Sequence, residues 1–156
     1  MQKYKIVSVH FDASQKLIGV PCGKSQKYDI AGLDIFMVLE SGYSDDELEE
    51  FLDNLFNLCF TKKSIEGQID PIQEYTNTKS YSASVKRLGL VSVTWLKGRG
   101  YEVTPTWQNA KMKNAFCHIG DKAISIPTDY EKGKLSEGFR SAMEMSPIGP
   151  LNKMPE

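Results

Sequence analysis

The stretch from Leu88 to Ser146 narrows the choice of folds for this 156-residue chain more than any other part of the sequence. Two runs of alternating apolar residues, LVSVTWL and YEVTP, are separated by Gly98-Arg99-Gly100. Glycines at such a tip allow the positive φ angles that a tight turn requires, so the pattern predicts an antiparallel hairpin. Because Pro105 lacks a backbone N–H, we expect the second strand to end there or to lie at a sheet edge.

The residues that follow the hairpin continue with further strands and turns. We expect the polar segment 107–115 to form a turn or a longer β-loop. Residues 116–119 and 122–126 predict two short strands that pair with each other across Gly120-Asp121, a favourable turn sequence. A final helix is expected after Asp129 or a few residues later. Its apolar stripe has helical spacing and comprises Leu135, Phe139, Ala142 and Met143.

The first forty residues contain two strand patterns joined by less regular segments. Residues 4–11 alternate between apolar and polar side chains, which predicts a half-buried strand. Residues 17–21 predict a short extended piece, and residues 23–32 predict a polar connection. The apolar run 35–39 is short, which favours a strand over a helix.

The clearest helix pattern begins at Ser44. Ser44 and Glu47 have the spacing of a capping box, and Tyr43 can pack on Leu48 at the helix entrance. Apolar residues then recur every three or four positions, so we expect the helix to end near Phe60.

The segment after this helix loses periodicity. Residues 61–77 contain Gly67 and Pro71 and predict a long surface loop with at most one turn of helix. Loops of this length in compact domains are often functional. A short helix is then expected from Thr78 or Ser80 until Gly89 stops it.

Together these elements predict a mixed α+β fold. A central, mainly antiparallel sheet is expected to pack with two main amphipathic helices and a short third helix. The length suits one hydrophobic core, so we assign residues 1–146 to a single α+β domain. Prolines and a glycine interrupt the tail 147–156, which we expect to be disordered.

Composition excludes several classes of protein. A formal net charge of −1 provides no general attraction to nucleic acids or anionic membranes. The chain has no apolar run long enough to span a membrane and no signal-peptide pattern, so we expect a cytoplasmic protein. Cys22, Cys59 and Cys117 are odd in number and form no CxxC motif, which predicts reduced cysteines without a zinc site.

Candidate catalytic residues are scarce. The two histidines, His10 and His118, lack a Ser, Cys or carboxylate partner at a catalytic spacing. The carboxylates of residues 45–50 would point around a helix instead of converging on one ion. We therefore predict no catalytic residue, no metal, no cofactor and no enzymatic activity. A small hydrolase that uses His10 or His118 is the less favoured alternative.

A mildly cationic and aromatic region lies between residues 75 and 101. Its members are Tyr75, Lys79, Tyr81, Lys86, Arg87, Trp95, Lys97, Arg99 and Tyr101. Such side chains suit a protein interface as well as RNA. The nearly neutral chain favours a protein partner, and a small nucleic-acid-binding module is the alternative.

The order of several short motifs resembles that of a known family, the immunity proteins of contact-dependent growth inhibition systems (CdiI type). The motifs, within residues 78–146, are Lys79-Ser80-Tyr81, Leu90-Val91-Ser92-Val93 with Trp95, Gly100-Tyr101 with Thr104-Pro105-Thr106, Asp121-Lys122-Ala123-Ile124 with Ile126-Pro127, and a helix from Leu135. Lys132-Gly133-Lys134 departs from the more acidic helix start expected of the family.

The resemblance implies a non-enzymatic cytoplasmic protein that binds and neutralises the C-terminal toxin domain, often a nuclease, of a cognate CdiA effector. It also implies a compact α/β protein whose sheet a toxin β-hairpin can extend, because an open sheet edge has unpaired backbone groups. We expect the edge at 101–106 and the loop 61–77 to form the docking surface. The expected toxin-binding residues are Tyr75, Lys97, Arg99, Tyr101, Glu102, Thr104 and Trp107. The sequence leaves the oligomeric state open.

Overall fold

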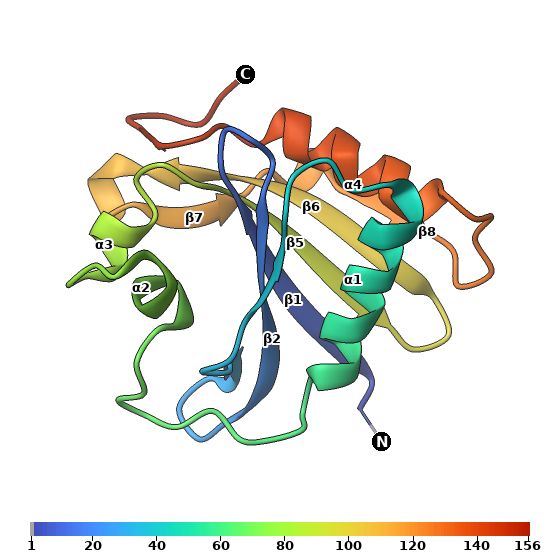
Figure 1. The fold of residues 1–156 in the computed structure, drawn as a ribbon, viewed down its shortest axis with the longest axis horizontal. Coiled ribbons are helices and arrows are strands. Elements are labelled where there is room, and N and C mark those ends of the chain that lie inside the picture. The colour runs from blue at the N-terminus through green and yellow to red at the C-terminus, as the bar shows by residue number, and fades with distance from the viewer. Residues whose placement is uncertain (1) are drawn as a thin grey trace.

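The fold was analysed in a computed structural model that describes residues 2–156. These residues form nine β-strands and four α-helices (Figure 1). In chain order, the elements are β1 (Tyr4–Phe11), β2 (Leu17–Ser25), β3 (Asp29–Gly32), β4 (Met37–Leu39), α1 (Asp45–Leu58), α2 (Pro71–Thr76), α3 (Tyr81–Ser84), β5 (Gly89–Leu96), β6 (Gly100–Asn109), β7 (Ala115–His118), β8 (Ile124–Ile126), α4 (Lys134–Met145) and β9 (Pro150–Leu151). The predicted α+β fold with a mainly antiparallel sheet is confirmed.

The sheet runs in the order β3-β2-β1-β5-β6-β7. β4 also pairs with β2, whereas β8 and β9 pair with β6. All pairings are antiparallel except that of β9 with β6. β5 and β6 form the predicted hairpin, and Gly98 and Gly100 at its tip have positive φ angles.

The two longer helices cover one face of the sheet, and the two short ones lie on the other (Figure 1). The main core joins α1 and α4 to valines of β1, β5 and β6, all fully buried: Val7, Val9, Val91, Val93 and Val103. A smaller cluster joins Ile18 and Val20 of β2 to Ile72 of α2 and to Val85. Among residues 2–156, no helix is long and apolar enough to cross a membrane.

Local signals at the helices are confirmed. The Ser44 side chain accepts from the Glu47 N–H, and the Glu47 side chain accepts from the Ser44 N–H, which completes the capping box of α1. The four predicted stripe residues of α4 are buried against the sheet. The loop 61–77 contains more structure than expected, because Asp70 caps the six-residue helix α2.

The prediction that residues 23–32 form a polar connection is wrong. β2 continues to Ser25, and β3 returns beside it after a turn. The Ser25 hydroxyl accepts from the Lys27 and Tyr28 N–H groups, and Asp29 adopts a φ of 68°. These side-chain contacts stabilise a hairpin that lacks the usual glycine turn.

The prediction that β7 and β8 pair with each other is also wrong. Both pair with β6, β8 at residues 101–103 and β7 at residues 106–109. A 3-10 turn, Gly120–Lys122, separates the two strands. β6 also extends through part of the predicted loop 107–115, where Gln108 is fully buried and donates to the Val85 and Leu88 carbonyls.

Consequently, Pro105 does not mark an edge or a strand end. Its carbonyl accepts from the Ile119 N–H, which lies between β7 and β8. The N–H and C=O of one strand residue point to the same side. The missing N–H of Pro105 would therefore point toward Ile119, between β7 and β8, so the proline removes no hydrogen bond between β6 and β5.

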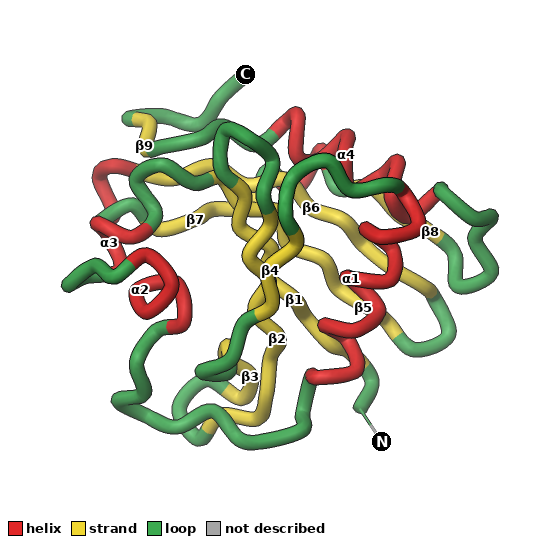
Figure 2. Tube along the Cα trace, in the orientation of Figure 1, coloured by secondary structure: helices red, strands yellow, loops and turns green. Residues whose placement is uncertain are grey.

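The C-terminal segment also differs from the expected disorder. Pro150 and Leu151 of β9 pair with Gln108 and Asn109 of β6 (Figure 2). β5 does not reach these two residues, because its pairing with β6 extends only from Gly100 to Pro105. The Gly149 N–H donates to the Leu88 carbonyl. The tail therefore continues the sheet beside β6.

Candidate partner-binding surface

The seven residues predicted to bind a partner do not share one surface. Thr104 and Trp107 are buried, with 4% and 8% of their surfaces exposed. Tyr101 is half-buried between Phe56 and Tyr130, and burial raises the pKa of its hydroxyl. These three side chains are part of the packed core or border it.

The other four lie in two separate places. Lys97, Arg99 and Glu102 are exposed at the tip of the β5–β6 hairpin, whereas Tyr75 is in α2. Figure 1 shows this tip and α2 at opposite sides of the molecule. Tyr75 packs edge-on against Phe36, with Lys16 over its ring.

The expectation of a free edge at residues 101–106 is wrong, because β6 pairs with β5 on one side and with β8 and β7 on the other. The ends of the sheet are β3 and β4 on one side and β7 and β8 on the other. An extended partner strand can therefore add at terminal strands such as these, but not along residues 101–106 of β6.

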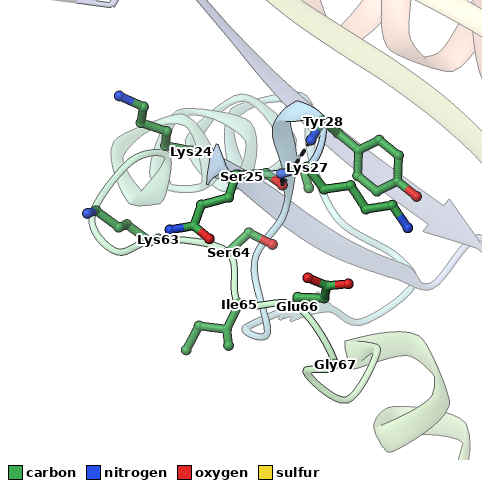
Figure 3. A pocket seen from close by; sticks show the side chains of 11 residues that line it. Lys24, Ser25, Lys27, Tyr28, Lys63, Ser64, Ile65, Glu66 and Gly67 are labelled. Carbon is green, nitrogen blue, oxygen red and sulfur yellow. Dashed lines mark hydrogen bonds between the residues drawn. The ribbon is translucent and has the colours of Figure 1, made fainter.

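A large hollow adjoins β3. It has a volume of about 800 Å³ and lies between the β2–β3 hairpin and the segment 63–67. Figure 3 shows Lys24 and Lys63 on one side of the hollow and Lys27 and Tyr28 on the other. Three lysines and one carboxylate, Glu66, line it, so its charge is positive although the whole chain has a net charge of −1. We call it the β3 hollow.

Exposed apolar side chains accompany these lysines. Tyr28 and Ile65 line the hollow with 67% and 61% of their surfaces exposed, and Ile69, on the same loop, is 68% exposed. Large apolar side chains exposed together near a rim of charge are typical of a protein-binding site.

The loop 61–70 is held against the β2–β3 hairpin by several bonds. The Ser64 N–H donates to the Lys24 carbonyl at 2.9 Å. The Ser64 hydroxyl and the Gln68 amide both donate to the Gly32 carbonyl, at 3.1 and 2.9 Å. Lys62 forms an ion pair with Asp34 at 2.6 Å, and this bond lowers the pKa of the Asp34 carboxyl. The hollow is thus bordered by two connected segments.

Neither histidine forms a recognisable catalytic pair. His10 is buried, neither of its ring nitrogens has a hydrogen-bond partner, and desolvation lowers its pKa to about 4, although the Ile18 carbonyl opposes this shift. His118 is exposed at the end of β7. Within residues 2–156, no cluster of His, Cys, Asp and Glu side chains could hold a metal ion.

The predicted docking surface contains the loop 61–77 but not the β2–β3 hairpin. The only sequence feature that could have indicated this part of the surface is the group Lys24, Lys27 and Tyr28, which follows an apolar run. Without a glycine turn between residues 25 and 29, this pattern resembles a polar connection as much as a hairpin.

No protein-family model matches the chain, and no curated protein matches its sequence. Two solved structures have a similar fold. A protein of unknown function from Neisseria meningitidis has a TM-score of 0.69 and 13% identity, with 92% of this chain and 96% of that chain covered. A chain of the CdiA-CT/CdiI toxin and immunity complex from Yersinia pseudotuberculosis has a TM-score of 0.63 and 12% identity, with 92% and 97% covered. At these identities, the likeness establishes a shared fold.

Proposed function

We propose that this chain is an immunity protein that binds and neutralises the C-terminal toxin domain of a cognate CdiA effector. The observation that carries the proposal is the fold shared with a chain of a CdiA-CT/CdiI complex over almost the full length of both chains. Under this proposal, the protein acts by binding the toxin, which we propose to be a nuclease. It needs no catalytic residue, metal or cofactor of its own.

We further propose that the toxin docks at the β3 hollow. β3 is a terminal strand, so an extended toxin segment can pair with those of its outer backbone groups that are free, and neighbouring side chains can select the partner. The Gly32 carbonyl is not among them, because it already accepts from Ser64 and Gln68. Tyr28 and Ile65 provide apolar contact area beside this strand.

Charge complementarity predicts the chemistry of the toxin segment. Lys24, Lys27 and Lys63 surround the hollow, and none of them forms an ion pair within the part of the chain that the structure describes. A segment with Asp or Glu beside an apolar anchor would satisfy both features of the hollow. Exposed charges of this kind mainly increase the association rate and the specificity.

The test is co-expression with the toxin domain encoded immediately upstream, followed by co-purification and binding kinetics. Wild-type protein should restore growth and co-purify with the toxin. Lys27→Glu with Lys63→Glu reverses two charges at the hollow, and we expect at least tenfold weaker binding, mostly through slower association. Lys97→Glu with Arg99→Glu is the matched control, because it reverses two exposed charges at the hairpin tip.

The outcomes separate the proposed function from its placement. If wild-type protein neither restores growth nor binds the toxin, the immunity function is wrong. If only the hairpin-tip variant loses binding, the function holds and the docking surface lies at the hairpin. Tight binding of wild-type protein to RNA without toxin, with affinity falling steeply as salt rises, would favour the nucleic-acid alternative instead.

A further inference from the structure

Two of the three cysteines lie beside each other on the main core side of the sheet. Cys22 is in β2, and Cys59 is the residue that ends α1. The Phe60 N–H donates to the Cys22 carbonyl at 2.9 Å, so the two main chains run side by side at these residues. Their separation along the sequence is large, and the fold alone brings them together.

The two thiols also meet at one residue of β1. The Ile6 N–H donates to the Cys22 Sγ at 3.3 Å, and the Cys59 Sγ donates to the Ile6 carbonyl at 3.7 Å. Both sulfurs therefore contact the backbone of a single residue. Both cysteines are buried, with 4% and 5% of their surfaces exposed.

The surroundings make the two thiols chemically unequal. The neighbouring Cys59 thiol, the Ile6 N–H and the charge of Lys5 lower the pKa of the Cys22 thiol, against the desolvation that burial imposes. The proximity of Cys22 and burial raise the pKa of the Cys59 thiol. Of the two thiols, Cys22 is therefore the one that loses its proton more readily.

We propose that Cys22 and Cys59 form an oxidation site, in which peroxide converts the two thiols to an intramolecular disulfide. This inference rests on the contacts of the two cysteines and does not depend on the proposed immunity function. The sequence predicts cysteines that stay reduced, whereas this proposal gives two of them a disulfide that forms on oxidation.

The chemistry needs hydrogen peroxide as the oxidant. The Cys22 thiolate attacks one peroxide oxygen, the O–O bond breaks and hydroxide leaves, which gives a sulfenic acid. The Cys59 sulfur then attacks the Cys22 sulfur, the S–O bond breaks, and water leaves with the Cys59 proton. The two thiols are oxidised and the peroxide is reduced to water.

The position of the bond gives it a structural consequence. Cys22 lies two residues before Lys24, and Phe60 leads directly into the loop 61–70. A disulfide would join the β2–β3 hairpin to the end of α1, next to both segments that border the β3 hollow. It would also close a loop between residues 22 and 59 in the unfolded chain, which stabilises the folded state.

The test uses the full-length protein treated with hydrogen peroxide, blocked with N-ethylmaleimide and mapped by mass spectrometry without reduction. We expect a linked Cys22–Cys59 peptide, the loss of two hydrogen atoms from the intact mass and a higher urea midpoint that dithiothreitol reverses. The Cys117→Ser variant is the control and should give the same crosslink, because Cys117 is in β7 at the far end of the sheet.

Recovery of Cys22 and Cys59 as separate alkylated peptides after treatment that oxidises Cys117 would overturn the proposal. So would a crosslink that forms only in denaturant. A third variant, Cys59→Ser, should leave Cys22 as a sulfenic acid that dimedone traps. Since the wild-type map decides the main question, the proposal remains testable even if a variant fails to fold.

Discussion

Helix α4 is capped by a residue from another helix, and removing that residue should destabilise the fold. The N-cap position of α4 is Gly133, which has a φ of 92° and no side chain to accept a hydrogen bond. Glu49 of α1 accepts instead, from the Gly133 N–H at 3.3 Å and from the Ser136 N–H at 2.9 Å. One carboxylate therefore satisfies two of the free N–H groups at the start of α4.

The magnitude follows from these two bonds. Replacing an N-cap side chain with alanine costs about 1 kcal/mol, and loss of a negative charge at a helix N-terminus adds about 0.3–1 kcal/mol. We expect Glu49→Ala to lower the free energy of unfolding by about 1.5 kcal/mol. With a urea m-value of about 2 kcal/mol per molar, the midpoint should fall by about 0.7 M.

Glu50→Ala is the matched control. Glu50 is the exposed neighbour of Glu49 on the same helix, and its side chain makes no hydrogen bond or ion pair within residues 2–156. Glu50→Ala should change the midpoint by less than about 0.2 M. Equal midpoints for the two variants would refute the view that Glu49 caps α4. Glu49→Gln, which keeps one acceptor oxygen, should fall between them.

Two further predictions concern the core. Burial lowers the pKa of His10 from its ordinary value of 6.5 to about 4 in the folded state. As the pH falls, the imidazole is therefore protonated in the unfolded chain before it is protonated in the folded protein. The free energy of unfolding should drop by roughly 3 kcal/mol between pH 6.5 and pH 4. This part of the pH slope should be absent in His10→Leu, and equal slopes in urea unfolding would contradict it. A Cβ at Gly89 would overlap the buried Phe11 ring, so Gly89→Ala should cost about 1–3 kcal/mol. Gly120→Ala, whose Cβ meets nothing, should stay within about 0.5 kcal/mol of wild type, and matching midpoints for the two alanine variants would disprove the overlap.

Features that depend on neighbouring residues could be predicted from the sequence. Ser44 and Glu47 cap α1 as expected, because both bonds form within one turn of the chain. The cap of α4 could not be found in this way. Glu49 lies more than eighty residues before Ser136, and no pattern near Gly133 identifies a carboxylate that the fold brings there.

Strand pairing likewise could be predicted where it depends on a local turn and not where it depends on distant strands. The β5–β6 hairpin was predicted because its turn fixes which strands meet. β7 and β8 also follow each other across a short turn, but each pairs with β6 instead. Their partner depends on the whole sheet, since β6 is long enough to pair with two short strands in succession. The sequence around Gly120 carries no information about that third strand.

The pairing of β6 also explains why the predicted toxin-binding residues do not share one exposed surface. The docking surface was assigned to residues 101–106 because Pro105 and nearby aromatic residues suggested an exposed edge. Because β6 lies inside the sheet and both faces of the sheet are covered, residues 103–108 are all buried. Thr104 and Trp107 are therefore buried although they point to opposite faces, and only the hairpin tip remains exposed. Unpaired strand edges then remain at the ends of the sheet. Of these, the β3 end combines a hollow, three lysines and exposed apolar side chains, which are features of a protein-binding surface that residues 101–106 lack.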